Sequence, residues 1–165
     1  MTKPDLISEF EYEGKVIVEW FDILEKEKIP ELDWQQVYVI GNLDGKVPVV
    51  MYDSKGDNLP GGKTEPGESL NETIQREIEE ELNMKVVSWE PLGYQKLTRP
   101  WDNTPTYQFR IYAKLEKIDD FSNDPGGSVI GHRIVELDNL NKFIKYGKVG
   151  DRLISLCEKY FNNAT

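Results

Sequence analysis

A helix-forming segment with acids on its buried side is the feature that most constrains this chain. Apolar residues recur at every fourth position and predict one stripe along a helix: Leu70, Ile74, Ile78 and Leu82. Ser69 is a favourable N-cap, and Glu72 three residues later completes a capping box. Asn83 can adopt the left-handed conformation that often follows a helix. The sequence therefore predicts an amphipathic helix over residues 70–82 that packs one face against a core.

Three glutamates near the end of this helix lower its stability unless they have a partner. Glu77, Glu80 and Glu81 are three and four positions apart, so they share a face. At roughly 100° per residue, Glu81 falls on the apolar stripe and Glu77 lies just outside it. Burial of an unpaired carboxylate, repulsion between like charges and the negative helix C-terminus all oppose this arrangement. A hard divalent cation such as Mg²⁺ would resolve all three problems, whereas a solvated acidic face is the alternative.

The loop before the helix favours the cation. The pairs Gly61-Gly62 and Pro66-Gly67 permit tight backbone geometry and a close approach of carbonyl groups to a ligand. Glu65 and Glu68 add two carboxylates at the mouth of the loop. A glycine-rich loop that leads into a helix with clustered acids is typical of a site for a metal and a phosphate.

The stretch from Gly62 to Met84 resembles the Nudix box, the pattern Gly-x5-Glu-x7-Arg-Glu-U-x-Glu-Glu-x-Gly-U, in which U is a bulky aliphatic residue. The residues that match are Gly62, Glu68, Arg76, Glu77, Ile78, Glu80, Glu81 and Met84. Asn83 stands where the pattern has its second glycine, a mild change because asparagine tolerates the left-handed conformation. The flanking segments also resemble the family: a β-hairpin and Leu-Pro-Gly-Gly before the box, and strands and a terminal helix after it.

The resemblance implies the Nudix fold, an α+β or α/β/α sandwich with a mixed β-sheet, in a single domain over residues 1–165. The order of predicted elements along the chain agrees with such a layered domain. The resemblance also implies a hydrolase that uses Mg²⁺ or Mn²⁺ to cleave a diphosphate linkage in a nucleoside-diphosphate-type small molecule. A homodimer is compatible with it.

The resemblance implies a role for each matching residue. Glu80 and Glu81 are expected to be the principal metal ligands, and Glu77 a third ligand or the base that activates water. The Gly61 carbonyl is a further candidate ligand. Arg76 is expected to orient the glutamates. Glu68 is expected to hold the junction between loop and helix, with direct catalysis as the alternative.

Some family members take the general base from a loop after the box. Four acids are candidates for that role, or for an extra metal ligand, although each can equally be a surface acid: Asp119, Asp120, Asp124 and Glu136. His132, the only histidine, is assigned no chemistry.

Several aromatic residues could stack on a nucleobase, although aromatic residues in strands are usually part of a core. They are Trp34, Tyr38, Tyr94, Trp101, Tyr107 and Phe109. Pro100 lies sixteen residues after the box, where members that cleave ADP-ribose often have a proline. Its neighbours do not resemble that subgroup, so nucleoside triphosphates, dinucleotides and nucleotide sugars all stay open as substrates.

The net charge of the chain argues against one class of function. The formal net charge of -10 argues against binding to a nucleic acid duplex, which requires clustered lysine and arginine. It does not exclude an anionic substrate, because a bound divalent cation reverses the local field. The chain has one cysteine, no apolar run of signal-peptide length and none of membrane-spanning length, so a cytoplasmic location is expected.

The remaining segments predict mostly strands. Residues 34–40 and 47–52 are joined by a turn at Asp44-Gly45 and predict a β-hairpin. The stretch up to residue 33 is ambiguous, with one apolar alternation between Tyr12 and Phe21 that is consistent with a strand. Other predicted elements are strands at 86–97, 107–118 and 128–137, a short helix within 138–146 and a closing helix at 151–161.

Two further functional classes compete with the hydrolase. The first is a non-catalytic Nudix-like domain that binds a nucleotide or a protein; such members usually lack glutamates of the box, and none is missing here. The second is an isomerase of related fold that acts on isoprenoid diphosphates. It would need a catalytic cysteine and a histidine-rich metal site, which one cysteine and one histidine do not readily supply.

Overall fold

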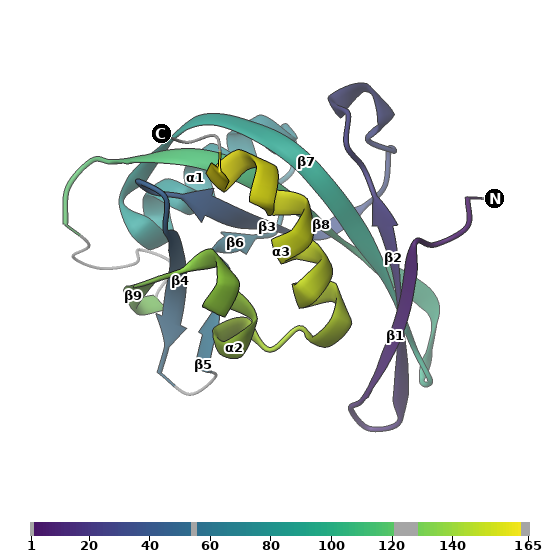
Figure 1. Cartoon of the computed structure of the whole chain (residues 1–165). Coiled ribbons are helices and arrows are strands. Elements are labelled where there is room, and N and C mark those ends of the chain that lie inside the picture. The colour runs from purple at the N-terminus through teal and green to yellow at the C-terminus, as the bar shows by residue number, and fades with distance from the viewer. Residues whose placement is uncertain (1, 54–55, 121–128, 163–165) are drawn as a thin grey trace.

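The computed structural model of the chain describes residues 2–53, 56–120 and 129–162 (Figure 1). These residues form a six-stranded sheet in the order β1-β2-β7-β8-β3-β6 and a three-stranded sheet in the order β5-β4-β9. The strands of the first sheet are β1 (Leu6–Glu11), β2 (Lys15–Asp22), β7 (Met84–Arg99), β8 (Asp102–Lys117), β3 (Trp34–Asn42) and β6 (Gly61–Gly62). Those of the second are β5 (Gly56–Asn58), β4 (Val47–Tyr52) and β9 (Val129–Val135).

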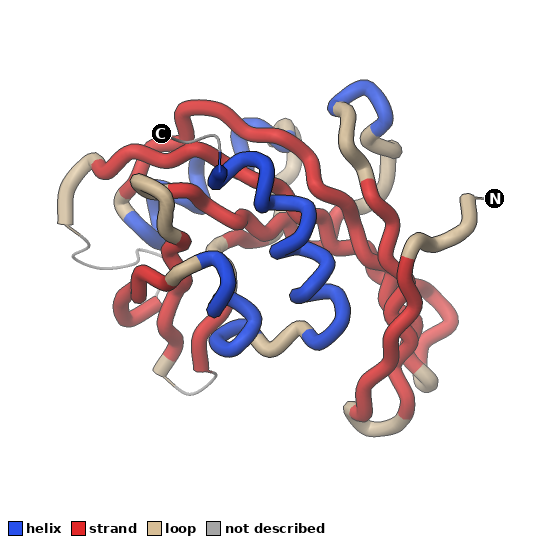
Figure 2. Tube along the Cα trace, viewed as in Figure 1, coloured by secondary structure: helices blue, strands red, loops and turns tan. Residues whose placement is uncertain are grey.

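Helices lie on both faces of the large sheet (Figures 1 and 2). The described helices are the short η1 (Lys26–Lys28) and η2 (Leu137–Asn139), and α1 (Leu70–Leu82), α2 (Leu140–Ile144) and α3 (Gly147–Asn162). β3 runs parallel to β8, while the other pairings of this sheet are antiparallel. The predicted α/β/α sandwich with a mixed sheet is therefore confirmed.

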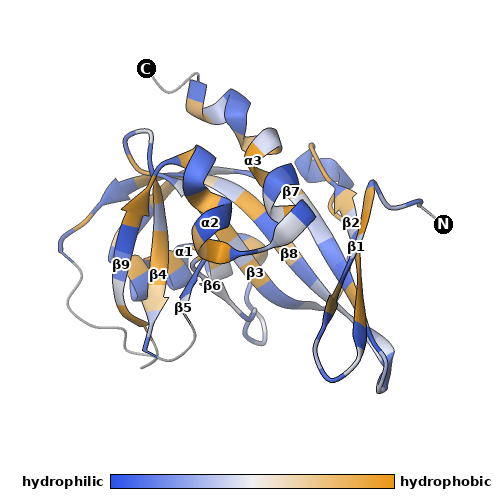
Figure 3. Cartoon of the chain, turned by 60° about the horizontal axis from the view of Figure 1, so that its bottom comes forward, coloured by the Kyte–Doolittle hydropathy of each residue, from blue (hydrophilic) through white to orange (hydrophobic). Residues whose placement is uncertain are grey.

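The alternation of side chains along β3 separates the two cores. Val37 and Val39 belong to a cluster with Ile74 and Ile78 of α1. Ile40, on the opposite face, belongs to a second cluster that contains residues of α2 and α3. Because successive side chains of a strand point to opposite faces, one apolar strand supplies both cores. Figure 3 shows apolar stretches on strands of both sheets, β4 among them.

The local signals around α1 are all confirmed. The Ser69 hydroxyl accepts a hydrogen bond from the Glu72 N–H, and the Glu72 side chain accepts one from the Ser69 N–H. Asn83 has the left-handed conformation, with φ of 54° and ψ of 43°. The helix therefore begins and ends where its capping residues predict, and this places its acids at fixed positions relative to the preceding loop.

Removal of the cap should weaken the whole junction between loop and helix. Ser69→Ala is expected to cost about 0.5–2 kcal/mol in the free energy of unfolding, because the first turn loses an acceptor. Chemical denaturation measures this loss, with Ser88→Ala on an exposed position of β7 as the control. If Ser69→Ala left unfolding unchanged but abolished turnover, Ser69 would have a functional role and not a capping one.

The predicted hairpin between residues 34 and 52 is wrong in its pairing. The turn itself forms, with left-handed Asp44 and Gly45, and Leu43 and Lys46 make a bridge. Beyond that bridge β3 pairs with β8, and β4 pairs with β9 and β5. Turn chemistry specifies a reversal of the chain, whereas the longer ladders with distant strands decide how the two strands continue.

The termini of the fold also differ from the predicted elements. The ambiguous N-terminal stretch forms a hairpin of β1 and β2 that extends the large sheet at its edge. The loop predicted after residue 52 contains the short β5. α3 begins four residues before the predicted helix, and it buries Leu153 and Cys157 in the core. None of the described helices has both the length and the apolar character that crossing a membrane requires.

Candidate active site

The acids of α1 meet the backbone of β6, the two-glycine strand that precedes the helix. β6 pairs with β3, so that Gly61 is opposite Tyr38. The Gly61 N–H donates a hydrogen bond to Glu81 Oε1 over 2.7 Å, and Glu81 is only 5% exposed. Glu81 thus lies on the buried side of the helix, as the sequence predicts, and the loop supplies a polar contact to it.

Tyr52, at the end of β4, is a second donor to Glu81. Its hydroxyl lies 3.4 Å from Glu81 Oε2. Burial, and next the negative charge of Glu81, raise the pKa of Tyr52 well above its usual value. The phenol therefore stays protonated and donates to the carboxylate. The sequence predicts Tyr52 only as the end of a strand, because its contact with Glu81 depends on how β4 packs beside α1.

Glu77 occupies the space that a side chain at Gly62 would fill. A Cβ atom built on Gly62 would lie 2.1 Å from Glu77 Oε1 and 2.4 Å from its carboxyl carbon. The pair Gly61-Gly62 therefore lets two carboxylates of α1 approach the loop backbone closely, Glu81 at the first glycine and Glu77 at the second. This is the close approach for which the glycines are predicted from the sequence.

Arg76 is the centre of a carboxylate network. Its Nε and Nη2 donate to the two oxygens of Glu68 over 2.7 and 2.9 Å, a bidentate pair. Its Nη1 lies 2.7 Å from Glu77 Oε1 and 3.4 Å from Glu80 Oε2. Its Nη2 also donates to the Lys63 carbonyl. These contacts join the loop before the helix to the last turns of the helix, as the positioning roles expected of Arg76 and Glu68 require.

Glu68 is held in its charged form at this junction. Hydrogen bonds from Arg76, and a further one from the Thr73 hydroxyl over 2.7 Å, lower the pKa of Glu68 from 4.5 to about 2. Glu68 accepts a fourth hydrogen bond, from the Glu65 N–H. The carboxylate therefore binds loop and helix together, and its two oxygens are already used by protein donors.

The stability that Glu68 supplies should depend on pH. Because its pKa is lower in the folded chain, its carboxylate stabilises the fold above about pH 4.5, and this contribution is lost as the pH falls toward 2. Thermal melts of the wild type and Glu68→Gln should differ most near neutral pH and converge near pH ~2. Glu65→Gln is the control, since Glu65 is 65% exposed and 4.0 Å from Arg76. A difference that stays constant with pH would contradict the ionic role.

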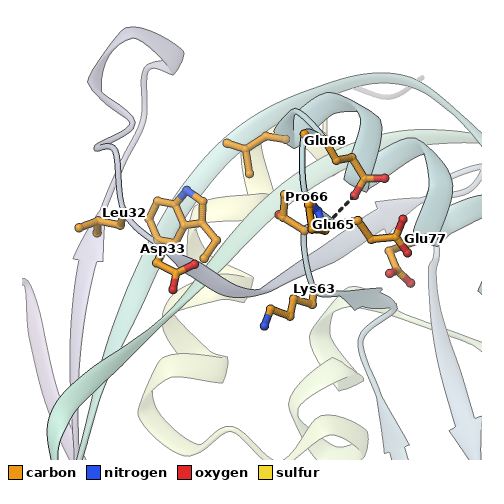
Figure 4. A pocket seen from close by; sticks show the side chains of 11 residues that line it. Leu32, Asp33, Lys63, Glu65, Pro66, Glu68 and Glu77 are labelled. Carbon is orange, nitrogen blue, oxygen red and sulfur yellow. Dashed lines mark hydrogen bonds between the residues drawn. The ribbon is translucent and has the colours of Figure 1, made fainter.

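A cleft of about 830 Å³ opens beside these acids (Figure 4). On one side it is bounded by Leu32, Asp33 and Trp34, and on the other by the loop of Lys63 to Glu68 and by Glu77. Figure 4 shows Glu65, Glu68 and Glu77 together on the loop and helix side. The cleft is large enough for a small-molecule ligand and borders Glu77, one of the predicted metal-site residues.

The acids proposed as an external base are not brought together at the site. Asp120 reaches the end of α1, where its carbonyl accepts from Asn83, but its carboxylate pairs with Lys117. Glu136 pairs with Lys46, at the opposite end of β4 from Tyr52. Asp119 shows no contact with the site acids, and Asp124 lies outside the described residues. Within residues 2–53, 56–120 and 129–162, no three Asp, Glu, His or Cys side chains are grouped as a ready metal cluster.

The other residues of interest have structural surroundings. Trp34 stacks on Phe109 and meets Tyr94, so these aromatic residues form a packed cluster. Pro100 lies in the turn between β7 and β8 against Gly14, a position that gives no support to ADP-ribose as the substrate. Cys157 is fully buried in α3, and burial raises the pKa of its thiol, which argues against the isomerase chemistry.

Comparisons with known proteins find similar sequences and similar folds. The family model of the NUDIX domain matches residues 35–156. The chain is 33% identical over 109 residues to the "Putative 8-oxo-dGTP diphosphatase YtkD" of Bacillus subtilis (strain 168), an alignment that covers 66% of this chain and 68% of that protein.

Solved structures show the same fold. The pyrophosphohydrolase BsRppH of Bacillus subtilis superposes with a TM-score of 0.72 at 21% identity, covering 93% of this chain and 97% of the other. A NUDIX hydrolase from Nitrosomonas europaea superposes with a TM-score of 0.60 at 20% identity, covering 76% and 88%.

Proposed function

The chain belongs to the NUDIX family, and from this premise we propose that it hydrolyses a diphosphate linkage in a nucleoside-diphosphate-type small molecule with the help of Mg²⁺ or Mn²⁺. One observation carries the proposal. Glu81, a buried carboxylate near the end of α1, is anchored to the Gly61 N–H, and Glu77 packs against Gly62. Both acids therefore lie at the loop that precedes the helix, the position expected for a site that binds a metal and a phosphate.

The donor set fits a hard divalent cation. Glu77, Glu80 and Glu81 provide carboxylate oxygens, which Mg²⁺ prefers, and the loop provides backbone carbonyl groups such as that of Gly61. The glycines leave room for the acids at the loop backbone, where a Cβ atom would exclude Glu77. We assign Glu80 and Glu81 as the principal ligands, Glu77 as a third ligand or the general base, and the Gly61 carbonyl as a further ligand.

The residues of the chain have distinct tasks in this proposal. When bound, the cation supplies positive charge that neutralises the diphosphate oxygens and helps to activate a water molecule. Arg76 holds Glu77 and Glu80 in place and offsets part of their mutual repulsion. Glu68 fixes Arg76, and Tyr52 and Gly61 fix Glu81. The protein thus acts mainly by holding charges in position before the reaction.

The substrate is a small nucleotide in this proposal. The name of YtkD supports a nucleoside triphosphate that loses diphosphate, and the cleft beside Glu77 can admit a ligand of that size. Attack at a phosphorus atom by water forms one new P–O bond and breaks the phosphoanhydride bond, so the products are two phosphate compounds. Identification of the products shows which phosphorus atom the water attacks.

The test is a hydrolysis panel. The protein is incubated with nucleoside triphosphates, ADP-ribose and a nucleotide sugar, first with EDTA, then with Mg²⁺ and with Mn²⁺, and the products are identified by chromatography. We expect turnover only with added metal. Metal-independent turnover would contradict the metal's role. Tight nucleotide binding with no turnover under any condition would favour the non-catalytic binding domain instead.

A further inference from the structure

β1 is the outer edge of the large sheet, and within residues 2–53, 56–120 and 129–162 it pairs only with β2. Figures 1 and 3 show this hairpin at the margin of the molecule, where its turn projects beyond the helices. A strand at the edge of a sheet directs alternate pairs of N–H and C=O groups away from its neighbour. β1 therefore offers backbone donors and acceptors to a further strand.

The side chains of β1 leave apolar surface exposed on both faces of the sheet. Ile7, Glu9 and Glu11 share one face, because successive side chains of a strand alternate. Ile7 is 59% exposed although it is apolar. Phe10 points to the other face and is 50% exposed. A strand added beside β1 would cover part of both side chains.

β1 also takes part in the wall of a second cavity, of about 590 Å³, on the face of the sheet opposite α1. Phe10 lines this cavity. Arg110 lines it as well, and is buried between the rings of Tyr38 and Tyr146. A strand added at the edge of β1 would therefore lengthen one wall of the cavity.

Two exposed aromatic rings continue this surface at the end of β1 and form an aromatic tip. Tyr12 lies in the turn after β1 and Trp101 in the turn between β7 and β8, with ring centroids 6.0 Å apart. Pro100 packs against Gly14, where a Cβ atom would lie 2.7 Å from the proline ring. The two turns are thus joined, and their exposed rings can bind a lysine or arginine side chain by cation–π contacts.

The charge along this edge is mostly negative. Glu9, Glu11 and Glu13 are exposed. Lys15 Nζ lies 3.5 Å from Glu9 Oε2, but both side chains are more than half exposed, so this ion pair is weak. Glu11 and Glu13 form no ion pair with the residues that the structure describes. The edge therefore has negative charge that a basic partner can neutralise.

The same acids argue against a second copy of this chain as the partner. Antiparallel pairing of β1 with another β1 places Glu9 and Glu11 of both copies on one face of the joined sheet, where they repel each other. Charged side chains on an edge strand are a common protection against such self-pairing. The charge thus favours a partner strand that carries lysine or arginine.

We propose that the β1 edge and the aromatic tip bind an extended segment of a partner protein in which lysine or arginine alternates with apolar residues. The segment adds to the large sheet as a strand antiparallel to β1. Its basic side chains lie on the face of Glu9 and Glu11, and its apolar side chains lie beside Phe10 on the other face. A basic residue at its start reaches the rings of Tyr12 and Trp101. The proposed catalytic acids take no part, so binding does not depend on hydrolysis.

A synthetic peptide, acetyl-Arg-Lys-Leu-Lys-Thr-Val-amide, tests the proposal. In antiparallel pairing it places lysines opposite Glu9 and Glu11, leucine opposite Phe10 and valine opposite Ile7. Fluorescence anisotropy of the labelled peptide with the 165-residue chain measures the affinity. An acidic peptide, with glutamate in place of the arginine and both lysines, should bind at least about 10-fold more weakly, because each cross-strand attraction becomes a repulsion.

Two N-methylated versions of the basic peptide test whether strand addition holds it. Methyl groups on alternate residues remove the N–H donors from one side of a strand and leave those of the other side. The version methylated on the side that faces β1 should lose binding, and the other version should bind like the parent peptide. Equal affinities of the two versions, whether high or low, would contradict a docked strand.

Reversal of the edge charge should reverse the preference. Glu9→Lys/Glu11→Lys should bind the acidic peptide better than the basic one. Glu27→Lys/Glu31→Lys is the matched control, because it changes two exposed acids outside the sheets and alters the net charge equally. This control should still prefer the basic peptide. Glu9→Gln/Glu11→Gln serves if the lysine variant does not fold, and should weaken the basic peptide without binding the acidic one more tightly.

Amide resonances of the ¹⁵N-labelled chain locate the bound peptide. The largest shifts should occur at Ile7 to Glu11 and at the indole of Trp101. Largest shifts at residues 77–81, or no binding at about 1 mM peptide, would overturn the proposal. A dimer of the free chain that is lost in Glu9→Lys/Glu11→Lys and that blocks the peptide would also overturn it, and would assign the edge to a second copy.

Discussion

Exchange of Glu81 for glutamine is expected to lower diphosphate hydrolysis by at least about 100-fold, the loss typical of a major electrostatic contact in catalysis. The exchange removes one negative charge that the proposed cation needs. It should leave the fold intact, because an amide oxygen can still accept the hydrogen bond from the Gly61 N–H. Without metal, the stability of the variant should equal or exceed that of the wild type, since a buried charge is removed.

The measurement combines two kinds of data. Thermal melts in EDTA and in excess Mg²⁺ report how much the metal stabilises each protein, and the wild type should gain more than Glu81→Gln. Hydrolysis rates are compared under the same conditions. Glu79→Gln is the matched control, because Glu79 is an exposed acid of the same helix. A Glu81→Gln protein that is strongly destabilised in EDTA but retains activity would make Glu81 a structural residue, and the proposed site would have to be abandoned.

The second large effect is expected at Gly61. Its φ of 155° lies in a region that side chains rarely adopt, and a Cβ atom there would lie 2.0 Å from the Val37 carbonyl oxygen. The obstacle is backbone of β3, which cannot rotate away. Gly61→Ala should therefore cost about 2–6 kcal/mol in the free energy of unfolding, from backbone strain and overlap together. It should also move the N–H that holds Glu81.

Gly67→Ala separates these two causes. Gly67 also has a positive φ, 81°, but a Cβ atom there would meet nothing within 4 Å. This variant should lose only about 1–2 kcal/mol from its backbone conformation. Urea denaturation of both variants measures the difference. Equal losses would show that the close approach of β6 to β3 contributes little, and would weaken the argument that the glycines shape the site.

The proposed catalytic helix could be predicted from the sequence because its signals are local. The spacing of apolar residues, the Ser69–Glu72 box and the left-handed Asn83 all lie within or next to the helix itself. The burial of Glu81 follows from the same periodicity, since a position on the apolar stripe faces the core. The resemblance of residues 62–84 to the Nudix box adds the family and, through it, the order of layers.

The contacts across the site could not be predicted in this way. Tyr52 reaches Glu81 only because β4 leaves β3 after one bridge and pairs with β9. Nothing near Tyr52 in the sequence indicates that contact. The error in the predicted hairpin has the same origin, because strand pairing depends on partners that are distant along the chain.

The sequence by itself determined the elements whose energy is local: α1 with its caps, the turn at Asp44-Gly45, and the acids that share a helix face. Only the tertiary structure decided which strands pair with each other. It also decided that Gly61 and Gly62 bring β6 against both β3 and the carboxylates of α1. The burial of Arg110 between two tyrosines beside a cavity likewise follows from the tertiary structure alone. The physical reason is that hydrogen-bond ladders, close packing and desolvation act between residues far apart in sequence. The free energy that these interactions contribute is determined only when the whole sandwich has formed.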